Sequence, residues 1–201
     1  MIYILDCGHG STTKGKRSPD GKFLEYKYNR IIGDLVSKQL KEMGIKHYFT
    51  YPIDKEEDLG LSKRAEVANA WARGYGAGNT LLISIHSNAA GSHGEWTKAQ
   101  GWSVYTTKGK TNSDKYAEIF WEEAKKVCDR VGRKVRSDMS DGDHDWEENF
   151  TVIYKSIMPS ILIEEFFYDN KDEMEWLLSE EGINTCVEII INSIKRIENI
   201  V

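Results

Sequence analysis

Two short segments, residues 2–5 and 80–85, constrain the fold more than any other part of this sequence. Both are largely apolar and too short for a core helix, which predicts strands buried on both faces. Apolar residues recur at helical spacing in segments 25–43, 61–73, 113–131 and 181–200. Shorter segments with the pattern of strands lie at 45–51, 102–106, 151–154 and 160–167. This alternation predicts an α/β fold with a mainly parallel, twisted sheet of about six strands and helices on both faces.

Chain length and composition predict one domain, spanning residues 1–201 without a linker or repeat. A chain of this size buries roughly 70% of its unfolded surface and needs no disulfide scaffold. Its three cysteines, at positions 7, 128 and 186, have no CxxC spacing, which favours structural thiols in a reducing compartment. No signal peptide opens the sequence and no apolar run approaches the roughly 20 residues of a membrane span. We therefore expect cytoplasmic synthesis and no membrane insertion.

The net charge of −5 argues against nucleic acid as a partner, because neutralising phosphates requires clustered lysine and arginine.

Each of the two buried segments leads into a histidine. His9 stands between Gly8 and Gly10, and His86 follows the second segment. The carboxyl ends of strands in an open α/β sheet are where ligands bind, so the two imidazoles are natural metal ligands if the strands are close. Glu25, at the amino end of the next helix, is the best candidate for a third ligand. Two histidines and one glutamate form an established zinc set that leaves a fourth position for water.

A general base is also expected at this edge of the sheet. Glu164 and Glu165 stand together near the end of the apolar segment 160–167. Burial raises the pKa of a glutamate toward the range in which it exchanges protons at neutral pH. The residue pattern alone leaves both carboxylates open as the base.

At these positions the sequence resembles the zinc-dependent N-acetylmuramoyl-L-alanine amidases of bacterial cell-wall turnover and phage lysis. Five family motifs occur in the family's order: Gly8-His9-Gly10; Glu25 with Asn29; Leu61, Arg64, Ala68 and Asn69; residues 84–89, Ser-Ile-His-Ser-Asn-Ala; and Pro159 with Glu164. The family usually has Gly-Phe two residues after the last glutamate, whereas this chain has Phe166 and Phe167. In having Phe-Phe here, the chain resembles some phage endolysins. Because neither phenylalanine is an expected metal ligand, the departure concerns the shape of the substrate-binding groove and the substrate subtype more than catalysis.

The resemblance implies hydrolysis of the amide bond between N-acetylmuramic acid and L-alanine in peptidoglycan. It implies one zinc ion per chain, held by His9, Glu25 and His86, which would lower the pKa of a bound water and polarise the carbonyl. Glu164, rather than Glu165, would take the proton and pass it to the leaving amine. It also implies a monomeric phage or prophage endolysin that acts on the cell wall after release.

Substrate contacts are expected from Ser11 and Asn88, which follow the two histidine ligands in the sequence, and from His144. His47 and His93 match no ligand position and are expected to be surface or loop histidines. His144 lies in an acidic segment, residues 138–148, that resembles the start of a calcium loop but lacks its glycine and its final glutamate. We expect a solvated loop there.

Two other functions remain open from the sequence. One is a zinc carboxypeptidase-like hydrolase of the stem peptide, which would need an arginine or similar clamp for a terminal carboxylate. The other is a catalytically inactive homologue that binds the cell wall. Intact candidate ligands and an intact candidate base argue against the inactive homologue.

Overall fold

The computed structural model describes residues 1–91 and 94–200. Its centre is a six-stranded sheet in the order β2-β1-β3-β6-β4-β5. The strands are β1 (Ile2–Cys7), β2 (His47–Phe49), β3 (Thr80–Asn88), β4 (Ser103–Thr106), β5 (Trp146–Glu147) and β6 (Ser160–Phe167). The first four strands in this order run parallel, and β4 reverses direction by pairing antiparallel to β6. The predicted α/β fold with a mainly parallel sheet is therefore confirmed.

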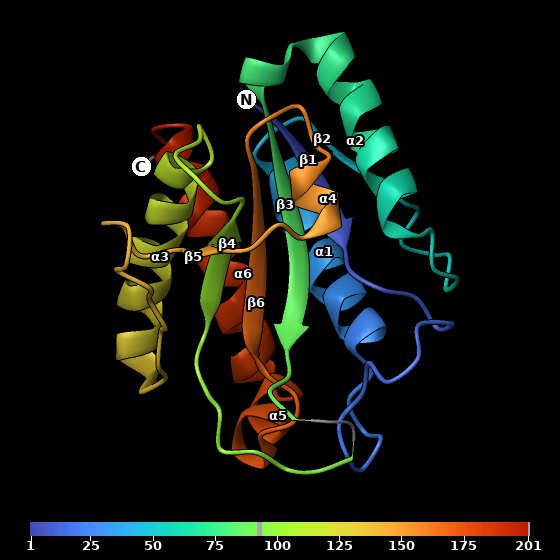
Figure 1. The fold of residues 1–201 in the computed structure, drawn as a ribbon, viewed down its shortest axis with the longest axis vertical. Helices are drawn as coiled ribbons and strands as arrows, with labels where there is room; N and C mark the ends of the chain where they lie inside the picture. Colours follow the sequence, from blue (N-terminus) through green and yellow to red (C-terminus); the bar gives the residue numbers. More distant parts are fainter. Residues whose placement is uncertain (92–93, 201) are drawn as a thin grey trace.

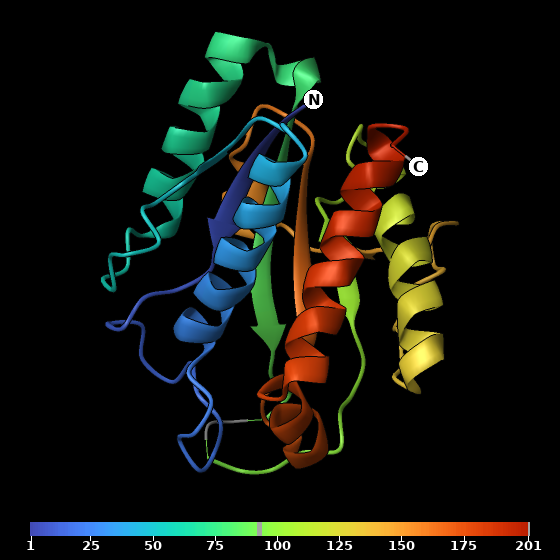
Figure 2. The same ribbon diagram turned by 180° about the vertical axis from the view of Figure 1, so that it is seen from behind.

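Helices cover both faces of the sheet (Figures 1 and 2). One face carries α1 (Glu25–Glu42), α3 (Asp114–Val131) and α6 (Glu180–Ile197), and the other carries α2 (Leu61–Tyr75) and the single-turn helix α4 (Thr151–Tyr154). A short 3-10 turn, η1 (Ala77–Asn79), precedes β3, and α5 (Lys171–Leu177) lies beyond the end of β6. None of the described helices has both the length and the apolar character needed to span a membrane.

The alternation of side chains along β1 divides the core between the two faces. Tyr3 and Leu5 are fully buried in the cluster that includes α1, α3 and α6. Ile2 and Ile4 pack in the smaller cluster with α2 and α4. Each fully buried side chain of this kind contributes about 1.5–3 kcal/mol, so burial on both faces fixes the register of β1 and the position of its carboxyl end.

The segment 151–154 is a helix, α4, and not the predicted strand. Its β-branched residues, Thr151, Val152 and Ile153, favour a strand on propensity alone. In the structure, however, Val152 and Ile153 are buried against the sheet face that carries α2. One helical turn places both side chains on that face, and the packing outweighs a propensity difference of about 1 kcal/mol.

The acidic segment 138–148 is not solvated throughout, contrary to the prediction. It contains β5, which pairs with β4, and the Asp145 side chain just before β5 is 1% exposed. The Thr106 hydroxyl donates a hydrogen bond to Asp145 Oδ2 at 2.6 Å. Burial, with the nearby Asp143 carboxylate, raises the pKa of Asp145 to about 7. The segment is thus anchored to the edge of the sheet by a buried carboxyl group.

Candidate metal centre

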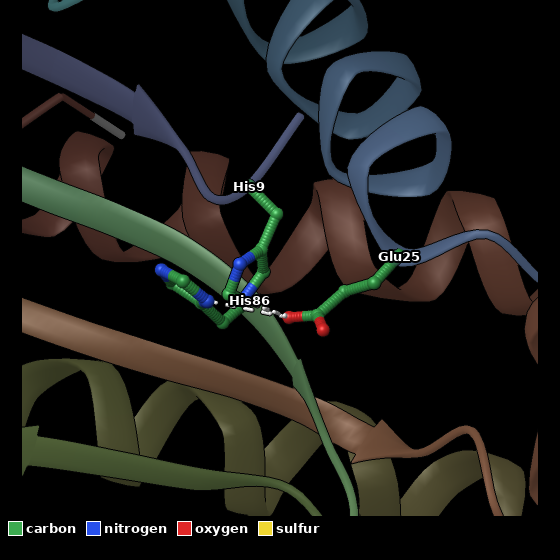
Figure 3. A group of neighbouring side chains, drawn as sticks. All are labelled: His9, Glu25 and His86. Carbon is green, nitrogen blue, oxygen red and sulfur yellow. Dashed lines mark hydrogen bonds and ion pairs between the residues drawn. The ribbon is translucent and has the colours of Figure 1, made fainter. Parts of the chain in front are cut away.

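The sheet order brings the two predicted histidines together. β1 and β3 are neighbours, with Cys7 opposite Ile85, so both strands end at the same edge of the sheet. His9 follows the end of β1 and His86 lies within the last residues of β3, and their ring centroids are 4.8 Å apart with nearly perpendicular planes. Glu25, the first residue of α1, points its carboxylate at both rings (Figure 3).

The donor atoms of these three side chains converge on a small volume. Glu25 Oε1 lies 3.3 Å from His9 Nε2 and 3.2 Å from His86 Nδ1, and one ligand atom of each residue falls within 4.8 Å of the others. The Glu25 side chain is 1% exposed, yet its Oε2 accepts no hydrogen bond from a described residue. A buried carboxylate oxygen left without a donor is costly unless a cation compensates it. Lys16 Nζ lies 3.9 Å from this oxygen, beyond hydrogen-bond distance, so both the donor set and the oxygen without a hydrogen-bond donor fit a zinc ion.

The protonation states of His9 and Glu25 suit metal binding. Burial lowers the pKa of His9, which favours the neutral imidazole that a metal requires. Burial disfavours ionisation of Glu25, but hydrogen bonds and charge from the two histidines hold its pKa well below the usual range. Burial likewise disfavours the His86 cation, and the Glu25 carboxylate outweighs this effect and raises the pKa of His86. Glu25 is therefore ionised and available as an anionic ligand.

The two glycines beside His9 are required by close packing. A Cβ atom at Gly8 would lie 2.2 Å from His86 Cε1, so a side chain there would displace the second histidine. A Cβ atom at Gly10 would lie 2.3 Å from the backbone nitrogen of Asp58. His9 itself has φ 64°, a left-handed conformation that costs a non-glycine residue about 1–2 kcal/mol. The surrounding contacts must hold this turn in place.

Side chains from α1 and α2 provide those contacts by binding three successive backbone carbonyls. Arg64 Nη1 donates to the carbonyl of Cys7 at 2.6 Å, and Asn29 Nδ2 donates to that of Gly8 at 3.2 Å. The His9 carbonyl accepts from Arg64 Nη2 at 2.9 Å and from Arg30 Nη1 at 3.1 Å. The left-handed turn is thus fixed from both faces of the sheet.

A buried ion pair supports Arg64 beneath the metal centre. Arg64 and Asp6 are each 1% exposed in their side chains, with Arg64 Nη1 3.1 Å from Asp6 Oδ1. Asp6 also accepts hydrogen bonds from Ser84 at 2.7 Å and from Thr50. Burial opposes its ionisation, but the Arg64 guanidinium and these hydroxyls lower the pKa of Asp6. The end of β1 is therefore tied to β3 and α2 by a fully buried charged network.

A pocket of about 270 Å³ opens at the metal centre, and Glu164 is one of its walls. The pocket is also lined by both histidines, by Lys16 and by residues at the start of α2 and α4. Glu164 lies opposite His86 in the β3–β6 register, and its Oε2 is buried without a hydrogen-bond partner among the described residues. Burial raises the pKa of Glu164 to about 7.

Glu165 points to the opposite face of the sheet, as expected for the next residue of a strand. Its side chain is completely buried near Cys186, and burial raises its pKa well above the usual value. Glu164, and not Glu165, therefore shares the pocket with the two histidines.

None of the three predicted substrate contacts, Ser11, Asn88 and His144, is among the residues that line this pocket. Ser11 is exposed and lines a neighbouring pocket, and Asn88 is half-buried at the end of β3, where its Oδ1 accepts from the Ala89 backbone. His144 lies against α3, stacked on Trp121 and 2.8 Å from Glu118, and does not line the metal pocket.

The remaining histidines are away from the centre or undescribed. His47 is half-buried on β2, with its Nε2 2.7 Å from the Ser37 hydroxyl. His93 lies outside the described residues.

Lys16 is a site residue that the sequence reading missed. Its Nζ lies 3.9 Å from Glu25 Oε2, and its side chain lines the pocket beside His9. It precedes Glu25 in an exposed, glycine-containing loop that has no strand or helix periodicity, so its only sequence signal was its closeness to Glu25 along the chain.

Comparison with known proteins agrees with this geometry. The family model described as N-acetylmuramoyl-L-alanine amidase matches residues 4–196. The amidase AmiC of Neisseria meningitidis serogroup B is 28% identical over 98% of this chain and 53% of its own length. The endolysin of Bacillus phage SPP1 is 23% identical over 99% of this chain and 66% of its own length. This chain therefore spans about half of the first relative and two-thirds of the second.

A solved structure shares the fold. The catalytic domain of CwlV, an N-acetylmuramoyl-L-alanine amidase from Bacillus (Paenibacillus) polymyxa var. colistinus, superimposes with a TM-score of 0.80 at 22% identity, covering 100% of this chain and 99% of the other. The match to the family model extends over nearly the whole chain and includes His9, Glu25 and His86. This chain belongs to the N-acetylmuramoyl-L-alanine amidase family.

Proposed function

We propose that this chain hydrolyses the amide bond between N-acetylmuramic acid and L-alanine in peptidoglycan, using one zinc ion held by His9, Glu25 and His86. One observation carries the proposal. Donor atoms from three separate parts of the chain lie within 4.8 Å of one another, beside a pocket whose wall presents Glu164, with its Oε2 buried and without a hydrogen-bond partner among the described residues. Family membership supplies the bond that such a site would cleave.

Zinc bound here would supply Lewis-acid polarisation of the scissile carbonyl and a lowered pKa for water. The protein's own residues would manage the proton. Glu164 would accept a proton from the attacking water and deliver it to the alanine nitrogen as the C–N bond breaks. Burial raises the pKa of Glu164 to about 7, which suits a group that must both take and release a proton near neutral pH.

The fixed end of β1 would keep the site in a reactive geometry. Arg64 and Arg30 hold the His9 carbonyl, so the imidazole direction is set before substrate binds. Preorganised ligands of this kind avoid the cost of rearrangement during the reaction. Ser11 and Asn88 remain the proposed substrate contacts near this end of the sheet. His144 would contact only a substrate long enough to reach α3.

We further propose that the chain serves as a catalytic domain of the lytic type. Similarity to the SPP1 endolysin and the Phe166-Phe167 pair after the catalytic glutamate support this proposal.

Zinc dependence predicts that metal and activity are lost together in His86→Ala. The protein as purified should hold about one zinc per chain by elemental analysis, and His86→Ala should hold almost none. Turnover on peptidoglycan should fall by more than about 100-fold, since even outer-shell changes at metal sites cost 10- to 100-fold. Zinc added back to chelator-treated wild-type protein should restore its activity.

His47→Ala is the matched control because His47 is a half-buried histidine on β2 of the same sheet, hydrogen-bonded to Ser37. It should retain both zinc and turnover. A full zinc complement with wild-type turnover in His86→Ala would refute the proposed ligand set.

A further inference from the structure

A second and larger pocket adjoins the metal centre. It has a volume of about 440 Å³ and lies on the connection between β1 and α1. Its polar lining consists of three cations, Lys14, Lys16 and Arg17, and of the hydroxyl-bearing residues Ser11, Thr13 and Tyr26. No acidic side chain is among the described residues that line it.

Lys16 joins this basic pocket to the catalytic pocket, because its side chain lines both. Its Nζ is 3.9 Å from Glu25 Oε2, so the boundary between the pockets lies directly beside the metal ligands. The two pockets therefore meet at Lys16.

The cations of the basic pocket are largely uncompensated. Of the three, only Lys16 pairs with a carboxylate in the described part of the chain. The three positive charges lie within residues 14–17, whereas the whole chain carries a net charge of −5. Positive charge lining a concave surface raises the local concentration of anions.

The backbone that carries these cations is ordered by hydrogen bonds. The Glu25 amide donates to the carbonyl of Lys16 at 3.1 Å, and Arg17 pairs with Leu24 in an antiparallel bridge. The Ser18 amide donates to the carbonyl of Phe23 at 3.0 Å. The start of α1 thus anchors the loop, and the cations project from a fixed backbone.

We propose that the basic pocket binds a carboxylate of the stem peptide, beyond the alanine of the scissile bond. This inference rests on the proposed function. The two sides of that bond differ in charge: the neighbouring N-acetyl sugars are neutral and the lactyl carboxyl is consumed in the amide, whereas the peptide carries free carboxylates. A residue of extended peptide spans roughly 3.3–3.6 Å, so the residue after alanine lies within about 7 Å of the bond.

Recognition by Lys14 and Arg17 would select for charge on the peptide. Arginine and lysine form charge-assisted hydrogen bonds with carboxylates, and an arginine does so in a bidentate fashion. An amidated stem peptide offers a neutral group in the same place and loses this attraction. The pocket therefore makes stem-peptide amidation a determinant of how well a cell wall is cleaved.

The test compares soluble peptidoglycan fragments before and after their peptide carboxylates are amidated with ammonia by carbodiimide coupling. Release of new alanine amino groups gives kcat/KM for each substrate. Wild-type protein should prefer the native fragments by about tenfold, and the preference should weaken as salt is raised. The double variant Lys14→Ala, Arg17→Ala should cleave both substrates alike, at the rate of wild type on the amidated one.

Lys22→Ala is the matched control, because Lys22 is a cation of the same connection that pairs with Asp20 and lies outside the pocket lining. It should keep the wild-type preference. Equal cleavage of both substrates by wild type, or an equal loss on both substrates in the folded double variant, would overturn the inference while leaving the amidase proposal intact. Cleavage of neither substrate by wild type would instead refute the proposed function itself.

Discussion

Glu164→Gln is expected to lower kcat on peptidoglycan by about 10²- to 10⁴-fold, the usual contribution of a positioned general base. Glutamine fills the same volume but cannot accept the proton from water. Zinc content should remain at about one per chain, because Glu164 lies in the pocket wall and is not one of the three converging ligands. Elemental analysis and single-turnover kinetics on the same preparation measure both effects.

Glu165→Gln is the matched control for this change. Glu165 is the next residue of the same strand and is fully buried on the opposite face, where burial raises its pKa and favours the neutral acid. Glutamine closely mimics that neutral form, so zinc content and kcat should stay near wild type. A normal kcat in Glu164→Gln together with a large loss in Glu165→Gln would mean that the base is assigned one residue too early.

Arg64→Ala is expected to destabilise the fold by about 3–5 kcal/mol, because it leaves the buried Asp6 carboxylate without its cation. The same change frees the carbonyls of Cys7 and His9 from the guanidinium that holds them. Zinc affinity should therefore fall as well, since the left-handed turn at His9 loses one of its supports. Urea unfolding and competitive zinc titration measure the two effects.

Two variants separate this buried network from a general effect of charge on α2. Lys63→Ala removes a cation from the adjacent, exposed position and should change the free energy of unfolding by less than about 0.5 kcal/mol. Asp6→Asn combined with Arg64→Met should recover part of the loss, because no unpaired buried charge remains. A cost below about 1 kcal/mol for Arg64→Ala, with unchanged zinc affinity, would contradict the account.

The overall architecture and the cluster of candidate metal-binding side chains were both accessible from sequence. His9 follows β1 and His86 lies near the end of β3, both strands have too little polarity to be exposed, and parallel strands of this kind end at a common edge. Glu25 opens the helix that must return from that edge. The spacing of the apolar residues therefore predicted the helices and strands. The positions of His9, Glu25 and His86 at the ends of these helices and strands predicted that the three side chains cluster.

Other features depend on tertiary packing that local pattern does not encode. No residue in β4 signals that it runs antiparallel to β6, because direction depends on how the connecting loops are routed. Segment 151–154 forms the helix α4 because Val152 and Ile153 pack against the sheet, although its β-branched residues favour a strand. The ion pair between Asp6 and Arg64 joins residues 58 positions apart. Their separation in the sequence carries no local signal of contact.

Mass spectrometry of peptidoglycan digested by the wild-type protein tests the central claim most directly. The account predicts free stem peptides that begin with an unblocked alanine, together with glycan strands of unchanged length whose lactyl groups end in carboxylates. Glu164→Gln protein should release neither product at a comparable rate. Shortened glycan strands, or peptides cut internally while alanine stays attached to the lactyl group, would contradict it.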